Sequence, residues 1–378
     1  MEKYQILVIN PGSTSDEVAY FEGDSQIFHK IVRYDAKLLE PYEGKKITEQ
    51  FQFRRDFVLN ELNIQGVDIK KITAVIGRGG LLKPLVSGVY EVNEDLKDDL
   101  KNEKYGSHAS NLGALLADSI AQELGIKSYI ANPVTVDEML DFTRYSGMPE
   151  NPRISIFHCL NQKRVGHLIE QHLNKEYKDL RLIIAHMGGG ISIGAHLLGK
   201  VVDVNNALDG EGPFSPQRAG SVPSGGLVKL CFSDKYSLSD IKLMLKGKGG
   251  MVAYTGTSDM KLLEKFAYLD TISEEERKSI KPDVTPDKVK SLIEGMAYQI
   301  SKDICSLTAI FNGRLDAIVL TGGLAYSDVI VGKIKQRVSW IAPVFVFPGG
   351  DEMQALRSAL ERALNGQEEV KIYKSDFS

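Results

Sequence analysis

The sequence is poor in the features that mark exported, membrane-spanning and disulfide-bonded proteins. Its 378 residues include only three cysteines, Cys159, Cys231 and Cys305. An odd number of widely spaced cysteines fits reduced thiols better than a disulfide framework or a zinc site. The chain has no run of ~20 apolar residues and no apolar stretch of signal-peptide length after Met1. We therefore expect a cytoplasmic protein that is neither exported nor embedded in a membrane.

Concentrated charge of one sign is also missing. The 46 basic and 50 acidic residues give a formal net charge of -4 and form no basic block, so nucleic acid is a poor partner. Hydrophobic residues make up 43% and charged residues 25%, which is typical of a globular protein with sizeable cores. A chain of this length is expected to form two domains of similar size, with a cleft between them.

The usual nucleotide-binding motifs are absent. The sequence contains no G-x-x-x-x-G-K-[ST] and no G-x-G-x-x-G between a strand and a helix, which counts against P-loop and Rossmann folds. Instead, four glycine-rich turns follow predicted strands. One such turn often only reverses the chain, but glycine tips at strand ends let backbone N–H groups approach phosphate oxygens. The four turns are Asn10–Ser15, His186–Gly190, Thr321–Gly323 and Pro348–Gly350.

Two of these turns belong to a repeated strand-turn-strand pattern. The buried strand predicted for residues 5–9 returns after its tip as Val18–Phe21, and the strand Leu182–Ala185 returns after Gly190. Gly12 and Gly189 lie 177 positions apart, close to half the chain. The pattern predicts two related domains. No repeat of 20–50 residues is present, which argues against a solenoid or propeller.

Between these landmarks, apolar spacing alternates between strand and helix periods, which predicts an α/β fold with helices covering the sheets. The clearest predicted helix, 287–312, is expected to end at a Gly313 C-cap. We expect a first domain of residues 1–150 plus 348–378, including a returning helix 351–364, and a second domain of residues 151–347. The predicted strands are 72–77, 128–131 and 316–320, and the other predicted helices are 111–124 and 155–172.

Two further segments carry charged residues in unusual surroundings. Residues 207–226 include 11 Gly, Pro or Ser residues among 20, together with Asp209, Glu211 and Arg218. Loops of this length are usually functional, although a flexible connection is the alternative. Arg78 lies between glycines in Gly77–Gly80, which suits a planar anion, whereas a lone arginine is more often a surface ion-pair residue.

Six stretches together resemble the acetate and butyrate kinase family, part of the superfamily that contains sugar kinases, Hsp70 and actin. The resemblance spans nearly the whole chain. The long run after Gly77 and the Val-Asp-Glu-Met run resemble butyrate kinases more than acetate kinases. The six stretches are Ile9–Ser15, Gly77–Pro84, Pro133–Met139, Ser155–His158, Ala185–Gly190 and Pro216–Gly220.

This resemblance implies two duplicated actin-like ATPase domains of the ribonuclease H-like type, with a nucleotide cleft between them. It also implies reversible phosphorylation of a short-chain carboxylate by ATP, giving an acyl phosphate and ADP. The substrate would be butyrate or a branched short-chain acid. Magnesium would accompany the nucleotide, and the enzyme would be a homo-oligomer built from dimers.

The resemblance further implies a role for individual residues. Asn10, Ser13 and Ser15 would line the first phosphate turn, and Thr321–Ala325 with Ser258–Asp259 would surround the adenosine. His158 and Arg218 would stabilise the moving phosphoryl group and the carboxylate, and Glu352 would lie near the magnesium. The implied catalytic residues are Asn10, Arg78, His158 and Arg218. The implied nucleotide-binding residues are Ser13, Ser15, His186, Gly188, Gly189, Gly190, Asp259, Gly322 and Gly323.

The sequence departs from the acetate kinase pattern at two positions. Asn132 replaces an acidic residue and Gln162 replaces a second histidine. Asp137 could supply the missing carboxylate to the metal, or it could cap the helix that follows. For His158, the alternative is a hydrogen-bonded core histidine on a helix.

The residue types suit transfer to a carboxylate. A carboxylate is already ionised at pH 7, so it needs no general base before it attacks phosphorus. The difficulty is repulsion between two anions, and catalysis therefore depends on positioning and on electrostatic stabilisation. Arg78, Arg218 and His158 are donors or cations of the required kind.

Two other functions share the expected architecture. A nucleotide-gated switch or filament protein would use the phosphate turns but would not require Arg78, Arg218 and His158. A sugar or polyol kinase would need an aspartate base beside the acceptor hydroxyl, and Asp209 or Asp137 could serve. The guanidinium groups favour a carboxylate acceptor.

Overall fold

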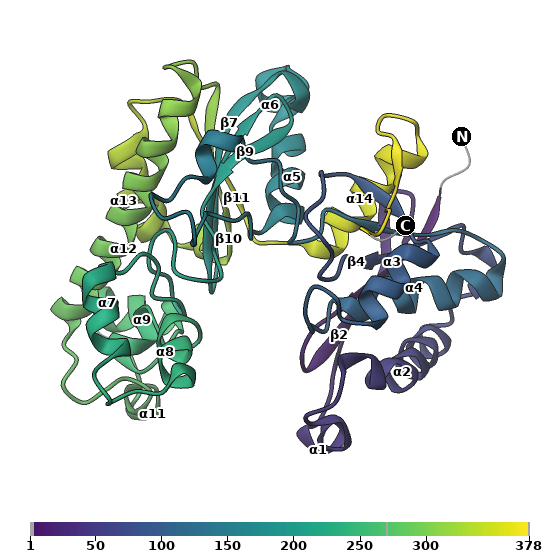
Figure 1. Ribbon diagram of the computed structural model, residues 1–378, viewed down its shortest axis with the longest axis horizontal. Coiled ribbons are helices and arrows are strands. Elements are labelled where there is room, and N and C mark those ends of the chain that lie inside the picture. Colours follow the sequence, from purple (N-terminus) through teal and green to yellow (C-terminus); the bar gives the residue numbers. More distant parts are fainter. Residues whose placement is uncertain (1–3, 270, 377–378) are drawn as a thin grey trace. The chain divides into compact units, whose positions relative to one another are not determined.

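A computed structural model describes residues 4–269 and 271–376 (Figure 1). Residues 1–3 and 377–378 of the expected first domain, and Asp270 of the second, lie outside the described residues. The chain folds as two compact units. Unit 1 consists of Met1–Asp137 and Asp351–Ser378, and unit 2 is Glu138–Gly350. The boundaries expected from the sequence lay at residues 150 and 348.

Unit 1 is built on a mixed seven-stranded sheet with the order β12-β5-β6-β4-β1-β2-β3. Strands β1, β2 and β3 form an antiparallel meander, and β4 and β6 continue the sheet in parallel from β1. Apolar side chains of α2 and α4 pack on the sheet face that carries Leu7 and Ile9. The strands are β1 Gln5–Pro11, β2 Ser15–Glu22, β3 Ser25–Arg33, β4 Ala74–Arg78, β5 Val89–Glu91, β6 Ser128–Ala131 and β12 Val370–Ile372. The helices are α1 Ala36–Leu39, α2 Phe51–Ile64, α3 Glu94–Lys101, α4 Asn111–Leu124 and α14 Glu352–Leu364.

Unit 2 is built on a five-stranded sheet with the order β11-β10-β7-β8-β9. Helices cover both faces, because alternate strand residues point to opposite sides. Ile183 packs in the cluster that includes α12 and α13, whereas Leu182 and Ile184 pack against α5. The strands are β7 Arg181–Met187, β8 Ile191–Leu197, β9 Lys200–Val204, β10 Ala317–Gly322 and β11 Val344–Pro348. The helices are α5 Cys159–Leu168, α6 Glu170–Leu173, α7 Ser224–Cys231, α8 Leu238–Leu245, α9 Met251–Thr255, α10 Met260–Glu264, α11 Glu274–Lys278, α12 Pro286–Leu307 and α13 Asp328–Val338.

The two units repeat the same five-strand arrangement. The order β3-β2-β1-β4-β6 in unit 1 corresponds to β9-β8-β7-β10-β11 in unit 2, with the same antiparallel and parallel pairings. The hairpins β1–β2 and β7–β8 confirm the strand-turn-strand units expected at Gly12 and Gly189. The duplication therefore extends beyond the hairpins to five strands of each sheet, whereas, among the described residues, β5 and β12 of unit 1 have no counterpart in the unit 2 sheet.

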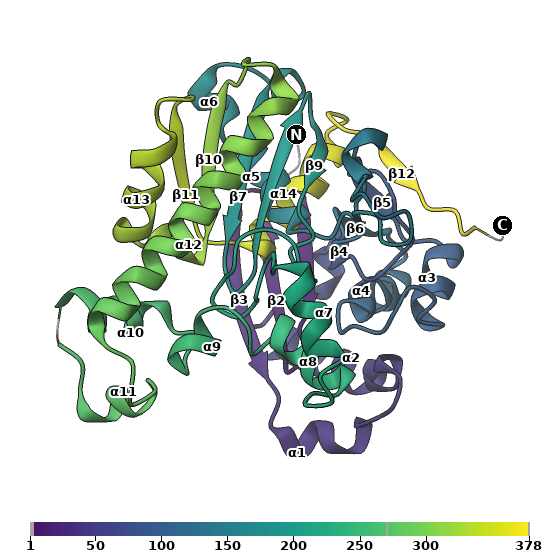
Figure 2. The ribbon, with the colours of Figure 1, turned by 60° about the vertical axis from the view of Figure 1, so that its left-hand side comes forward.

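Helix α12 shows how a local pattern specifies an element. The Thr285 side chain accepts a hydrogen bond from the Lys288 N–H, Pro286 occupies the first turn, and one apolar stripe is buried over 22 residues. In Figure 2, α12 lies across the sheet of unit 2, where it contacts β7 and β8. Among residues 4–269 and 271–376, no helix is long and apolar enough to span a membrane.

Two helix predictions were wrong at one end. Residues 155–158 are not helical, and α5 begins at Cys159. The preceding chain is held in place by a hydrogen bond from the Ala207 N–H to the Ile156 carbonyl. Helix α12 ends at Leu307 and tightens into a 3₁₀ turn, Thr308–Phe311. Asn312 caps this turn with φ 48°, and Gly313 directly after it is also left-handed, with φ 78°.

The long loop was predicted to cover residues 207–226 without regular structure. Its last three residues instead form the start of α7, which begins at Ser224. Pro223 precedes this helix, and its carbonyl accepts hydrogen bonds from the N–H groups of Gly226 and Leu227. Proline beside a helix start is favourable because its missing N–H is not needed there.

Candidate active site

Three of the predicted residues meet at one edge of the unit 1 sheet. Asn10 and Arg78 lie near the ends of β1 and β4, which are adjacent and parallel, so their carboxyl ends meet. The Asn10 Nδ2 donates to Glu352 Oε2 at 2.7 Å, and Arg78 forms an ion pair with the same oxygen. Glu352 opens α14, directly after the N-cap Asp351. Unit 1 thus presents an amide, a guanidinium and a carboxylate together.

This cluster bears on where a magnesium ion could bind. Within residues 4–269 and 271–376 there is no group of three or more metal-binding side chains. Magnesium carried by nucleotide phosphates keeps several waters and needs only one or two carboxylates. Glu352, whose side chain is more than a third exposed, fits that kind of site.

Asp137 ends unit 1 and follows the bridge between Leu85 and Val136. Its main-chain N–H donates to the Leu85 carbonyl at 2.8 Å. The expectation that Asp137 caps the next helix is wrong, because the next helical turn, Asp141–Arg144, begins after Leu140. Its local backbone pairing holds Asp137 away from the capping position.

The first phosphate turn connects β1 and β2. The Gly12 N–H donates to the Ser15 carbonyl at 2.6 Å, which closes a tight tip that carries Ser13 and Ser15. A Cβ on Gly12 would lie 3.0 Å from that carbonyl oxygen. Glycine is therefore favoured at this position by the close approach of the backbone.

The second turn, between β7 and β8, is covered by other predicted site residues. A Cβ on Gly190 would collide with the Arg218 guanidinium, and one on Gly188 would lie 3.2 Å from the His186 Nε2. The Gly189 carbonyl accepts a hydrogen bond from the Ser215 Oγ at 2.6 Å. The glycine tip, His186 and Arg218 therefore form one assembly.

Arg218 comes from the long loop that the sequence marked as functional. Its guanidinium donates to the Ala207 carbonyl, and its main-chain N–H donates to the Ser215 Oγ at 3.1 Å. Burial lowers the pKa of the guanidinium, with no opposing carboxylate nearby in the described part of the chain. An arginine pKa is so high that the group stays charged at pH 7. Unit 2 thus holds a half-buried cation over its glycine tip.

His158 and His186 lie against each other. Their rings stack with centroids 3.9 Å apart and planes 14° apart. The His186 Nδ1 lies 2.7 Å from Asn161 Oδ1, an acceptor, so this nitrogen carries the proton. The backbone of His158 is non-helical, at the position that precedes α5.

A buried hydrogen-bond chain orients the His158 ring. Burial lowers the pKa of His196 well below its usual value, so that ring is neutral, and its Nε2 bonds Gln162 Oε1 at 2.9 Å. The Gln162 amide then donates to the Ser192 Oγ at 2.8 Å, and the Ser192 hydroxyl lies 2.9 Å from the His158 Nδ1. This order gives the serine proton to Nδ1 and leaves the proton of a neutral His158 on Nε2.

The two departures from the acetate kinase pattern both have structural roles. Gln162 is the link in the hydrogen-bond chain just described. Asn132 is buried with φ 43°, a left-handed conformation that asparagine tolerates, and its Oδ1 accepts from the Gly88 N–H at 2.8 Å. Neither side chain replaces the missing carboxylate.

The residues expected around the adenosine lie on separate turns of unit 2. Asp259 caps α10, where its side chain accepts from the Leu262 N–H at 3.0 Å. Ser258 precedes Asp259, and its Oγ accepts a hydrogen bond from the Gln217 Nε2 at 3.2 Å. Gly322 has φ 87° and packs on the Met187 backbone, whereas the face of Gly323 is open. Gly322 is thus required by packing, and Gly323 leaves space for a ligand.

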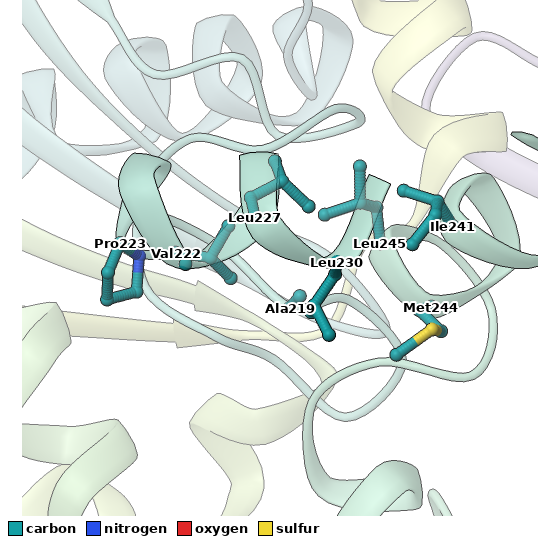
Figure 3. A pocket seen from close by; sticks show the side chains of 9 residues that line it. Ala219, Val222, Pro223, Leu227, Leu230, Ile241, Met244 and Leu245 are labelled. Carbon is teal, nitrogen blue, oxygen red and sulfur yellow. The ribbon is translucent and has the colours of Figure 1, made fainter. Parts of the chain in front are cut away.

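An apolar pocket of about 500 Å³ lies between α7 and α8, one residue beyond Arg218 along the chain. Figure 3 shows the side chains of Leu227, Leu230, Ile241 and Leu245 gathered along this groove. Its lining is apolar enough to take an alkyl group.

Three structural partners were missed from the sequence. Ser192 and Asn161 hold the two stacked histidines, and Arg54 lies under the first phosphate turn. Ser192 lies just after the glycine-rich turn that follows β7, and this position was the only sign in the sequence that it belongs to the site. Asn161 and Arg54 lie on ordinary helical segments without a motif.

Comparison with solved structures shows the two-domain fold of the actin-like ATPases that the sequence predicted. Acetate kinase from Porphyromonas gingivalis superimposes with a TM-score of 0.75 at 18% identity, covering 96% of this chain and 100% of that one. A propionate kinase from Francisella tularensis gives a TM-score of 0.70 at 18% identity, covering 94% of this chain and 99% of that one.

Sequence relatives define the family more narrowly. Butyrate kinase 2 of Clostridium acetobutylicum is 49% identical over 98% of this chain and 100% of its own length. A probable butyrate kinase of Clostridium botulinum (strain Alaska E43) is 46% identical over 98% of this chain and 99% of its own. The acetokinase family profile matches residues 153–338. The chain belongs to the butyrate kinase family.

Proposed function

We propose that this enzyme transfers the γ-phosphoryl group of ATP to a short-chain carboxylate, butyrate or a branched analogue, in a reversible reaction. A bond forms between a carboxylate oxygen and the γ-phosphorus. The bond to the β–γ bridging oxygen breaks with its electron pair, and ADP leaves. The observation that carries the proposal is the assembly of Arg218, the stacked histidines and the glycine tip in unit 2. The family relationship supports it.

The proposed nucleotide contacts follow from the two turns. In unit 1, Asn10, Ser13 and Ser15 contact phosphate, and in unit 2 His186 and the Gly188–Gly190 backbone do so. Gly322, Gly323 and Asp259 contact the adenosine, where the open face of Gly323 supplies space.

The proposed catalytic groups counter negative charge. Arg218 and Arg78 attract the carboxylate and the equatorial phosphoryl oxygens, as guanidinium forks suit planar anions. The His158 Nε2–H donates a hydrogen bond to a phosphoryl oxygen. No side chain has to remove a proton from the acceptor.

Magnesium would be held by Glu352, with Asp137 as the proposed second carboxylate, and would neutralise charge on the phosphates. Arg78 and Glu352 pair with each other. When the phosphates bind beside them, Arg78 would bind phosphate oxygens and Glu352 would bind the magnesium. We also propose a cytoplasmic location, a homo-oligomer built from dimers, and a domain division that follows the two compact units.

The test is an acyl hydroxamate assay with ATP and magnesium across C2–C5 acids. Formation of butyryl or branched acyl hydroxamate at a higher kcat/KM than acetyl hydroxamate supports the proposal. Glycerol and hexoses serve as parallel acceptors, and phosphorylation of either in place of an acid would overturn it. ATP hydrolysis that no acid accelerates would point instead to a nucleotide switch.

A further inference from the structure

A fully buried arginine lies beneath the first phosphate turn. Arg54 projects from α2 and has no exposed surface. Its NH1 donates to the Gly12 carbonyl at 2.7 Å and its NH2 to the Ser13 carbonyl at 3.2 Å. One side chain therefore holds two successive carbonyls of the turn.

The guanidinium is itself fixed on every other side. Gln50 Oε1 accepts from the Arg54 Nε at 3.0 Å and from its NH2 at 2.8 Å, and Asp16 Oδ1 accepts from NH1 at 2.5 Å. The Tyr34 hydroxyl donates to the other Asp16 oxygen. Because the charges of Arg54 and Asp16 cancel, this cluster fixes the conformation of the turn and adds little net electrostatic potential at it.

Peptide geometry links this cluster to the opposite side of the turn. In a planar trans peptide, the carbonyl of one residue and the N–H of the next point in opposite directions, and the described residues contain no cis peptide bond. With the Gly12 and Ser13 carbonyls directed at Arg54, the N–H groups of Ser13 and Thr14 point away from it. The Thr14 carbonyl is held too, by the Tyr34 N–H at 2.9 Å.

We propose that Arg54 is a positioning residue for the nucleotide, which holds the first turn so that the Ser13 and Thr14 N–H groups face a phosphate. This inference rests on the proposed function and adds to it a residue that touches no substrate. Backbone N–H groups in successive residues form an anion-binding concavity only when their carbonyls are directed elsewhere.

In unit 2, the glycine turn is also held by hydrogen bonds to its carbonyl side, but from different residues. The Gly189 carbonyl accepts from the Ser215 Oγ at 2.6 Å and from the Gln217 N–H at 3.2 Å, which directs the Gly190 N–H to the other side. The recurrence of a carbonyl-side brace at both turns supports a role in phosphate binding, since stability alone would not require it at both tips.

The experiment compares two variants with a matched control. Arg54→Lys keeps the charge opposite Asp16, but a lysine ammonium cannot hold Gln50, Asp16 and both carbonyls at once. The double variant Arg54→Met with Asp16→Asn removes both buried charges and keeps the volume, so folding does not depend on the ion pair. The control is Arg357→Lys in the same unit, where Arg357 is also buried and bonds the Gly23 carbonyl between β2 and β3 at 3.2 Å.

The measurements are the ADP dissociation constant by titration calorimetry, the KM values for ATP and butyrate, and the melting temperature. We expect both Arg54 variants to raise the ADP Kd and the ATP KM by about tenfold or more, since a misplaced turn loses aligned donors. The butyrate KM at saturating ATP should change less than about threefold. Arg357→Lys should lower the melting temperature while the ADP Kd stays within about twofold.

An ADP Kd within twofold of the parent in a folded Arg54 variant, with a melting temperature lowered as in the control, would overturn the proposal. If Arg54→Lys does not fold, the double variant decides by the same criterion. A parent protein that binds ADP but forms no acyl hydroxamate would refute the proposed function alone, because the Kd comparison needs no acceptor.

Discussion

At the scale of single residues, Arg218 depends on its surroundings more than on its own charge. Its planar guanidinium lies on Gly190 and is anchored at the Ala207 carbonyl. We expect Arg218→Ala to lower kcat by roughly 10²–10⁴-fold, the range for losing a transition-state charge stabiliser. Arg218→Lys should recover little of this loss, because an ammonium lacks the planar fork. Coupled assays of ADP release measure the rates, and kcat within threefold of the parent for Arg218→Ala would refute the role.

His158 offers a second test at this scale. His158→Ala should lower kcat with the melting temperature nearly unchanged, whereas a core histidine would show mainly as lost stability. Ser192→Ala removes the proton donor to Nδ1, so the ring can turn or change tautomer, and about tenfold slower turnover is expected. Ser306→Ala is a control for the loss of a hydroxyl, because Ser306 is exposed and its hydroxyl donates to the Asp303 carbonyl at 2.9 Å. Equal activity of Ser192→Ala and that control would contradict the assigned chain.

Asp303 on α12 gives a pH prediction separate from catalysis. Burial raises its pKa from 3.8 to about 6, with Lys302 and Arg153 opposing and Glu211 reinforcing the shift. A raised folded-state pKa means that the group's contribution to stability is complete below the unfolded pKa and is lost as pH rises toward 6.

We therefore expect Asp303→Asn to be more stable than the parent at pH 7.5 by about 1–2 kcal/mol, after allowance for partial exposure. The gap should narrow as pH falls toward 4. Urea unfolding at pH 7.5 and pH 5 measures it, and a gap that widens at pH 5 would contradict the assignment.

At the scale of elements, two glycines on neighbouring strand ends should behave differently when replaced by alanine. Gly190→Ala collides with the Arg218 guanidinium and should lower kcat toward the level of Arg218→Ala. Gly323→Ala meets no atom within 4 Å in the protein and should raise only the ATP KM. Steady-state kinetics with melting temperatures distinguish the two, and an unchanged kcat for Gly190→Ala would contradict the arrangement.

The elements themselves were largely predictable. The boundaries of α4, 111–124, and of β6, 128–131, agree with the sequence pattern, because apolar periodicity and the Gly125 cap at φ 65° are local signals. The start of α5 was missed because the preceding chain is held by the Ala207 N–H, a contact from far along the sequence. The helix propensity of a short stretch of sequence cannot reveal a contact with a residue so far along the chain.

At the scale of the whole molecule, exposed apolar side chains bear on the proposed oligomer. The face formed by α7 and α8 exposes 84% of Phe232 and 72% of Leu238. Apolar patches of this kind mark interaction surfaces. We expect the parent to sediment as a dimer or larger oligomer. The double variant Phe232→Ser with Leu238→Ser should have a lower sedimenting mass than the parent.

Trp340→Ser is the control for this prediction, because Trp340 is 79% exposed at a site outside the α7–α8 face. This control should leave the sedimenting mass unchanged. A parent that sediments as a monomer at assay concentrations would contradict the prediction, as would an unchanged mass for the double variant.

The sequence by itself determined the glycine turns, the alternation of strands and helices, and the duplication of a strand-turn-strand unit. These features depend on neighbouring residues, because turn conformation and apolar periodicity are set within a few positions. The same local motifs sufficed to recognise the family.

Only the tertiary structure decided what surrounds each turn. Asn10 meets Glu352 across 342 positions of the chain, and Arg54 reaches the Gly12 carbonyl from a helix with no motif. A hydrogen-bond chain through Gln162 and Ser192 sets the proton of His158. Such contacts depend on which strands pair and which helices cover them, and no local pattern in the sequence encodes that information.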